Sequence, residues 1–185
     1  MDMSMCTMDG GSAPISFEDV LHTYSDMVYR LAFSRVRNSF DANDITQEVF
    51  LKYIRAAKSY NDEEHRKAWL IKTTINASKT LVLSSWSRRR SSAELSDEGL
   101  GVTAVTKDKN LETIETKSVV LSAVMELPKK YRTVIHLFYY EDMSLTDISE
   151  TTGLAVNTVK SQLHRARGLL KEHLDKMGVD FNDIS

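Results

Sequence analysis

Basic and hydrogen-bonding side chains recur along residues 156–175, where the spacing of apolar residues predicts the last helix of the chain. Between Asn157 and Lys171 there are four basic residues and no carboxylate. A helix with such a face fits the major groove of duplex DNA, where it lies between two rows of phosphates. A helix that only faces solvent usually mixes both signs of charge. The candidate DNA-contacting residues are Asn157, Thr158, Lys160, Ser161, His164, Arg165 and Arg167.

A shorter predicted helix and a turn precede this basic helix. Ser144 can cap a helix over residues 144–151, and Asp147, three positions later, can complete a capping box. Gly153 supplies the backbone freedom that a sharp turn requires. The residues expected to be buried in the basic helix are Val159, Leu163, Ala166 and Leu170. The pattern therefore predicts a helix-turn-helix that binds DNA.

A second basic stretch lies in the first half of the chain. Seven basic residues and no acid occur between His65 and Ala93, within and after a helix predicted over residues 64–87. Cations, an amide and aromatic rings suit single-stranded DNA, which needs phosphate neutralisation and a stacking surface. The candidates are Lys72, Asn76, Lys79, Arg88, Arg89 and Arg90. The alternative is a solvated charge run, and for Trp69 we favour a place in the core.

The buried side of this basic helix is predicted from its apolar and small residues. They are Trp69, Leu70, Thr73, Ala77, Thr80 and Leu81.

The helix predicted over residues 41–59 has an acidic start, with Asp41 as its cap, and two different faces. The side expected to be buried consists of Ile45, Val49, Tyr53 and Ala56, flanked by Phe50, Ile54 and Ala57. The other side consists of Asp44, Gln47, Glu48, Leu51 and Arg55. Leu51 is a large aliphatic residue among polar ones, which a partner surface would use. The equally balanced alternative is an ordinary exposed leucine beside acids that favour the helix dipole.

Composition places the chain among globular proteins that lack a metal or redox site. Its 185 residues are 42% hydrophobic and 27% charged, with a formal net charge of -2. Cys6 is the only cysteine, which excludes an internal disulfide and fits a reducing cytoplasm. The five histidines form no close ligand pair and no phosphate-binding glycine loop is present. We therefore expect no enzyme activity, no metal and no cofactor. In addition, no apolar run in the sequence approaches the length of a membrane span.

The chain is predicted to be all-α, because prolines and glycines are sparse and strand patterns are weak. The predicted helices cover residues 16–38, 41–59, 64–87, 112–126, 129–140, 144–151 and 156–175. They form two small helical domains, at residues 15–90 and 112–177. The expected remaining segments are a flexible lead (1–14), a flexible linker (91–111) and a tail (178–185).

Together these motifs resemble the extracytoplasmic-function (ECF) class of bacterial RNA polymerase sigma factors, in the sigma-70 family. The segment from Asp41 to Leu51 resembles the family pattern D-x-x-D-x-x-Q-E-x-F. The other matching motifs, in the same order as in the family, are Ala68-Trp69-Leu70 followed by Asn76, then Leu127-Pro128, then Thr158 to Arg167. The resemblance covers residues 17–175.

The resemblance implies that the first domain is sigma region 2, which binds the polymerase clamp and opens the minus-ten promoter element. It implies that the second domain is sigma region 4, which recognises the minus-thirty-five element. It also favours the partner-surface interpretation of the acidic helix, whose clamp contacts would be Asp44, Gln47, Glu48, Leu51 and Arg55.

By the same resemblance, Tyr60, Asn61 and Arg66 belong to a loop that walls a pocket for a flipped promoter base, with Asn76 near its floor. Capture of the extruded base offsets the cost of unpairing without nucleotide hydrolysis. The linker holds six acids against three bases between residues 91 and 117, like the family segment that threads the polymerase channel. Residues 127–140 resemble the helix that meets the polymerase flap.

The partners implied are core RNA polymerase (clamp and flap), promoter DNA and an anti-sigma factor that can hold the protein at the membrane, with no small-molecule substrate. The expected location is the cytoplasm. The alternative is a helix-turn-helix regulator that never joins the polymerase, which leaves residues 41–55 and 66–90 without a role.

The chain departs from the family pattern at Thr80, Ala155 and Gln162. Alanine is a poor helix cap, so we expect the recognition helix to begin later, with Asn157 as its cap. Glutamine in place of arginine at position 162 suggests one fewer phosphate contact or a different base preference.

Overall fold

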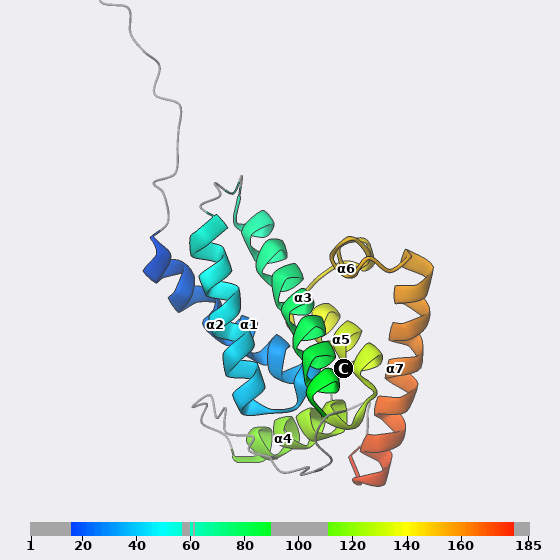
Figure 1. Cartoon of the computed structure of the whole chain (residues 1–185). Helices are drawn as coiled ribbons and strands as arrows, with labels where there is room; N and C mark the ends of the chain where they lie inside the picture. Colours follow the sequence, from blue (N-terminus) through cyan, green and yellow to red (C-terminus); the bar gives the residue numbers. More distant parts are fainter. Residues whose placement is uncertain (1–15, 57–59, 61, 90–110, 180–185) are drawn as a thin grey trace, which may run out of the picture.

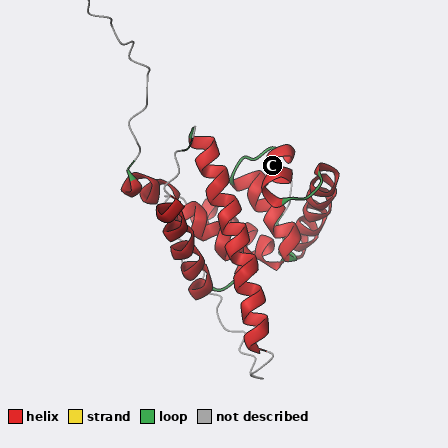
Figure 2. Ribbon diagram, turned by 45° about the horizontal axis from the view of Figure 1, so that its top comes forward, coloured by secondary structure: helices red, strands yellow, loops and turns green. Residues whose placement is uncertain are grey.

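All regular structure in the described part of the chain is helical. The computed structural model describes residues 16–56, 60, 62–89 and 111–179, with side chains described outside 82–89 and 111–118. The elements are α1 (Phe17–Val36), α2 (Ser39–Ala56), α3 (Glu63–Arg89), α4 (Leu111–Glu126), α5 (Lys129–Ile135), the π-helical turn η1 (His136–Tyr140), α6 (Leu145–Thr152) and α7 (Val156–Lys176). Figures 1 and 2 show this arrangement. The all-α prediction is confirmed, and the predicted helix boundaries hold within three residues.

Helices α1, α2 and α3 pack against one another as the first bundle. Ser16 caps α1, since its Oγ accepts a hydrogen bond from the backbone N of Asp19 at 3.1 Å. The helix ends at Arg37, whose φ of 58° is left-handed. The core of this bundle contains, among others, Val28, Leu31, Ile45, Val49, Leu70 and Ile75.

The predicted cap of α2 and one of its predicted buried residues are wrong. Asn38 supplies the cap instead of Asp41, since its Oδ1 accepts from the backbone N of Asp41 at 3.0 Å and the helix begins at Ser39. Ile54, predicted to flank the buried side, is 51% exposed. α1 and α3 cover the opposite face of α2 and leave this edge open.

The buried stripe of α3 also differs from the prediction. Thr80 is exposed, whereas Ile71, Thr74, Ile75 and Ser78 are buried beside the correctly predicted Leu70 and Ala77. The hydroxyls of Thr74 and Ser78 donate to backbone carbonyls four residues earlier, at 2.8 and 2.7 Å, so the polar atoms are satisfied inside the core.

Helices α4 to α7 form the second bundle, in which α7 packs against α4, α5 and α6. The predicted helix over residues 129–140 changes from α to π geometry at His136, where the ring stacks on Tyr140 with centroids 5.3 Å apart. The core of this bundle includes Leu127, Leu137, Ile148, Val159 and Leu174.

The two bundles are in direct contact, which the sequence did not predict. α1 packs against α5 and α3 packs against α6, so that one continuous core joins the bundles. In Figure 1, α5 and α6 lie between α3 and α7. The predicted lead and almost all of the predicted linker lie outside the described residues.

Two buried arginines hold the contact between α1 and α5. Arg35 donates to Thr133 Oγ1 at 2.8 Å. Arg132 donates to the carbonyl oxygens of Ser34, Met125 and Leu127. Burial, together with Arg132, lowers the pKa of Arg35 to about 10. The contact therefore brings two cations together, and no ion pair among the described residues neutralises either one.

Candidate nucleic-acid interface

The predicted helix-turn-helix is present as α6, a glycine turn and α7. Ser144 and Asp147 form the predicted capping box: Ser144 Oγ accepts from the backbone N of Asp147 at 3.2 Å, and Asp147 Oδ2 accepts from the backbone N of Ser144 at 3.1 Å. Gly153 ends α6 with a left-handed φ of 75°. That conformation favours glycine, so the turn into α7 follows from the sequence.

The start of α7 agrees with the predicted range of 156–175, but the expectation of a later start with Asn157 as the cap is wrong. The helix begins at Val156, with Ala155 as its N-cap, and Asn157 already lies inside the helix. The carbonyl of Ala155 accepts from the backbone N of Thr158 at 2.8 Å and of Val159 at 3.0 Å. These backbone hydrogen bonds start the helix, because Ala155 has no side-chain hydrogen bond that could cap it.

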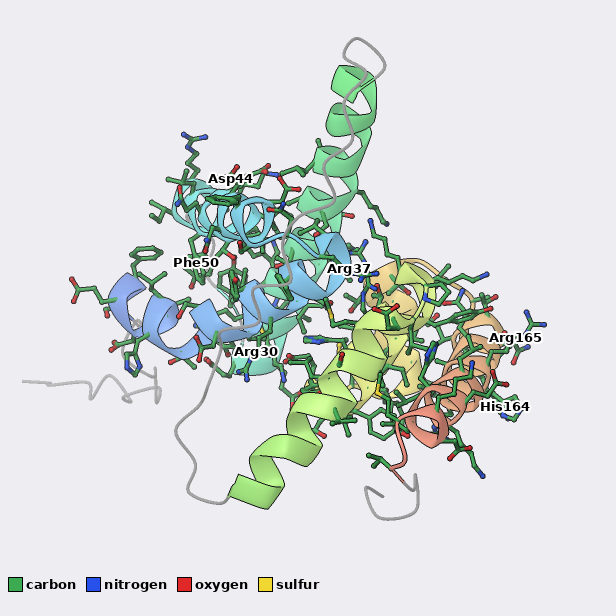
Figure 3. The ribbon with its side chains drawn as sticks, turned by 90° about the horizontal axis from the view of Figure 1, so that it is seen from below. Arg30, Arg37, Asp44, Phe50, His164 and Arg165 are labelled. Atoms are coloured by element: carbon green, nitrogen blue, oxygen red, sulfur yellow. The ribbon has the colours of Figure 1, made fainter. Side chains whose placement is uncertain are left out.

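The outer face of α7 carries most of the predicted DNA-contacting residues. Its buried face consists of Val159, Leu163, Ala166, Leu170 and Leu174. The first four of these residues were predicted to be buried. The exposed residues of the candidate set are Asn157, Lys160, Ser161, His164, Arg165 and Arg167. Thr158 is half-buried. In Figure 3, His164 and Arg165 project from α7 away from the rest of the molecule.

Contacts within the second bundle orient two of these cations. The guanidinium of Arg167 lies 5.5 Å from the ring centroids of both Phe138 and Tyr139. The interaction of Arg165 with Tyr131 lowers the pKa of that phenol. Gln162 lies at the edge of the buried face and is half-buried. α5 and η1 therefore support the basic face from behind.

The exposed face of α3 carries three of the predicted minus-ten residues. Lys72, Asn76 and Lys79 are all exposed and follow one another at spacings of four and three residues. This spacing places them in one row along the helix. Asn61 and Arg90 lie outside the described residues, and Arg88 and Arg89 end α3 without described side chains.

Tyr60 belongs to an aromatic cluster at the start of α3. Its ring stacks on Tyr53, with centroids 5.4 Å apart, and meets Trp69 edge-on at 6.0 Å. Burial raises the pKa of the Tyr60 hydroxyl, which is buried and has no hydrogen-bond partner in the described part of the chain. Trp69 is half-buried, in agreement with the favoured core interpretation.

Arg66 differs from the other predicted minus-ten residues, because it is buried. Its guanidinium pairs with Glu63, donates to Tyr53 Oη at 3.2 Å and lies 5.6 Å from the Tyr60 ring centroid. Tyr24 donates to the same Glu63, and burial raises the pKa of this tyrosine. Arg66 therefore supports the Tyr60 ring and is not positioned as an exposed phosphate contact.

The acidic helix α2 presents its predicted face to solvent. Asp44, Gln47, Leu51 and Arg55 are exposed and Glu48 is half-buried. Glu48 pairs with Lys52 at 2.6 Å on the same helix. Figure 3 shows Asp44 on the outer side of α2, with Phe50 on the side that faces α1.

The described residues contain no cluster of three or more histidine, cysteine, aspartate or glutamate side chains that could hold a metal ion. None of the helices in this part of the chain combines the length and apolar character needed to cross a bilayer.

Two family models match this chain in the order of its two bundles. Sigma-70 region 2 matches residues 20–88, and Sigma-70, region 4 matches residues 118–170. The ECF RNA polymerase sigma factor SigW of Bacillus subtilis is 28% identical over 86% of this chain and 89% of its own. The RNA polymerase sigma factor SigV of the same bacterium is 32% identical over 80% of this chain and 84% of its own. The chain is an ECF sigma factor of the sigma-70 family.

Solved structures share the fold of this sigma factor. The sigma factor RpoE, in complex with the anti-sigma factor NepR from Bartonella quintana, has a TM-score of 0.68 and 21% identity, covering 86% of this chain and 96% of that one. CnrH in complex with the cytosolic domain of CnrY has a TM-score of 0.57 and 20% identity, covering 86% and 88%.

The roles of Arg35 and Arg132, the two arginines at the junction between α1 and α5, were not predicted from the sequence of this sigma factor. Arg35 and Arg132 are separated by nearly a hundred residues and belong to helices that no short motif connects. The sequence shows only that a cation lies within a mainly apolar helix face. That observation does not identify the residues to which the arginine donates.

Proposed function

We propose that this sigma factor binds core RNA polymerase through α2 and promoter DNA through α3 and α7, and so starts transcription. The observation that carries this proposal is the presence of two chemically opposite exposed faces in one chain. One face is acidic and apolar, on α2, and the other is basic, on α7. The first suits a protein surface and the second suits a polyanion.

The minus-thirty-five element is assigned to α7. An exposed basic helix that follows a tight turn can enter the major groove, with cations beside phosphates and polar side chains at base edges. The proposed contacts are Asn157, Thr158, Lys160, Ser161, His164, Arg165 and Arg167.

The minus-ten element is assigned to the exposed row of α3 together with the aromatic cluster around Tyr60. Lys72 and Lys79 neutralise phosphates, and Asn76 between them can hydrogen-bond a base edge. The Tyr60 ring, supported by Tyr53 and Arg66, offers a stacking surface for an extruded base. Strand opening is then driven by binding, without catalysis by the protein.

The polymerase clamp is assigned to α2, through Asp44, Gln47, Glu48, Leu51 and Arg55. An anti-sigma factor is proposed as a second protein partner, on the basis of two solved structures with this fold. RpoE is in complex with the anti-sigma factor NepR, and CnrH is in complex with the cytosolic domain of CnrY. The alternative of a regulator that never joins the polymerase has no support, since the region 2 match covers almost all of the first bundle.

The double variant Glu48→Lys with Leu51→Asp tests the clamp assignment. It reverses one charge and places another on the apolar part of the α2 face. We expect it to abolish binding to core polymerase and run-off transcription, because like charges and an unpaired buried carboxylate both oppose docking.

Circular dichroism provides the control, since both side chains are outside the core and helical content should not change. Transcription by the double variant at the wild-type level would contradict the clamp assignment.

A further inference from the structure

Phe40 exposes its ring to an unusual degree. It is 80% exposed, compared with 50% for Leu51 and 51% for Ile54, and has the highest exposure among the exposed large hydrophobic residues of the described chain. Burying a phenylalanine side chain is strongly favourable. An aromatic ring left in solvent therefore offers binding energy to a partner.

Helical geometry places Phe40 in the same row as the proposed clamp contacts. At about 100° per residue, Gln47, Leu51 and Ile54 all lie within about 40° of Phe40 around the axis of α2. Phe40, Leu51 and Ile54 thus form an apolar row about 21 Å long. Asp44 and Glu48 border this row on one side.

The start of α2 holds Phe40 on a defined element. Asn38 accepts from the backbone N of Asp41 through its side chain, at 3.0 Å, and from that of Ala42 through its carbonyl, at 2.9 Å. Phe40 therefore belongs to a capped first turn. A rigid helix loses little conformational entropy when its side chains dock.

We propose that Phe40 is an additional apolar anchor for the clamp of core RNA polymerase, extending the α2 interface one turn toward the helix N-terminus. This inference rests on the proposed function of α2. The partner surface has apolar recesses for Phe40 and Leu51, with cationic groups beside them that meet Asp44 and Glu48. The clamp is favoured over other occupants because Phe40 continues the face already assigned to it.

The test compares full-length Phe40→Ala and Phe40→Leu with the unmodified chain, using purified bacterial core RNA polymerase as the probe. The alanine variant should weaken binding to core about ten- to a hundredfold, because burial of the ring is lost. The leucine variant should retain most of the affinity. Met177→Ala is the matched control: Met177 is 45% exposed but lies after α7, outside the α2 face, so its loss should leave affinity unchanged.

The outcomes separate this inference from the proposed function. If Leu51→Asp abolishes core binding while Phe40→Ala leaves it unchanged, the Phe40 anchor is wrong and the clamp assignment stands. If neither variant weakens binding, the clamp assignment itself is wrong. A lower melting temperature of free Phe40→Ala would show that the ring packs within the chain, and a loss of self-association in sedimentation would assign it to a second copy. Either result would overturn the inference.

Discussion

The cations of this protein differ in whether solvent or protein surrounds them. Lys160, Arg165 and Lys72 are exposed on helices, where they can meet phosphate or base. Arg66 and Arg132 are buried and donate to groups of the protein itself. Residue type and spacing predicted the first group, whereas Arg66 was assigned to the promoter-base pocket by the family resemblance. Its burial shows a supporting role, because its guanidinium pairs with Glu63 and lies beside the Tyr60 ring.

Arg165→Ala should weaken binding to a minus-thirty-five duplex by about 1 to 3 kcal/mol if the side chain reaches a base edge. The measurement is fluorescence anisotropy with cognate duplexes and with duplexes substituted at each position. Specificity should relax at one position only.

Lys160→Ala is the comparison for this experiment. A phosphate contact would weaken binding to all duplexes about equally and reduce the salt slope by about 1. If Arg165→Ala binds every duplex with unchanged affinity, the assignment of Arg165 to the DNA interface is wrong.

The helices show how much local sequence determines. Periodicity predicted each one, and the capping box at Ser144 and the glycine turn at Gly153 were recognisable because they depend on neighbouring residues only. The errors concern helix edges. Thr80 and Ile54 lie at borders of apolar stripes, where the crossing of the next helix decides which side is covered.

The start of α7 gives a prediction for stability. Ala155 has φ -62° and ψ 144°, close to the conformations of the capping residues Ser16 and Ser144, but it has no side-chain cap bond. Ala155→Ser should therefore gain such a bond and raise the free energy of unfolding by about 1 kcal/mol. Urea denaturation provides the measurement.

Ser144→Ala is the mirror variant, because it removes an existing cap. It should lower the free energy of unfolding by about the same amount. If Ala155→Ser gives no gain while Ser144→Ala gives the expected loss, the backbone at Ala155 does not accommodate a capping side chain.

The two bundles of the described chain pack against each other, yet the proposed task spans a long distance. A globular body of about 140 residues has a radius of gyration of about 14 Å. Promoter elements centred about 25 base pairs apart are separated by about 85 Å of duplex DNA. If one molecule contacts both elements, as proposed, its two bundles must separate. The hydrogen bonds of Arg35 and Arg132 across the contact, and the ion pair of Lys67 with Glu141 at 3.2 Å, would then break. The charge of Arg132 opposes that of the buried Arg35, which makes the opening less costly.

The two junction arginines should respond differently to the same substitution. Arg132→Met leaves the buried carbonyls of Ser34, Met125 and Leu127 without this donor, so it should lower the free energy of unfolding by about 1 to 3 kcal/mol. Arg35→Met should cost less, since it removes a buried cation whose one side-chain partner, Thr133, still donates to the carbonyl of Lys129.

Chemical denaturation of both variants at neutral pH provides the comparison, with Arg37→Met as the surface control. Arg37 forms an exposed ion pair with Glu126 at 3.4 Å, and its loss should change stability by less than about 1 kcal/mol. Equal losses for Arg35→Met and Arg132→Met would contradict the roles assigned to their hydrogen bonds.

The helices, the helix-turn-helix, the basic face of α7 and the acidic face of α2 could be predicted from the amino-acid sequence. These features depend on residues a few positions apart, which helical periodicity expresses directly. The contact between the bundles, the support of Tyr60 by Arg66 and the hydrogen bond from Arg35 to Thr133 became visible only in the folded chain. Those contacts join residues that are distant in the chain or depend on how helices cross. Burial depends on how the helices pack against one another, and the pattern of a single sequence does not describe that packing.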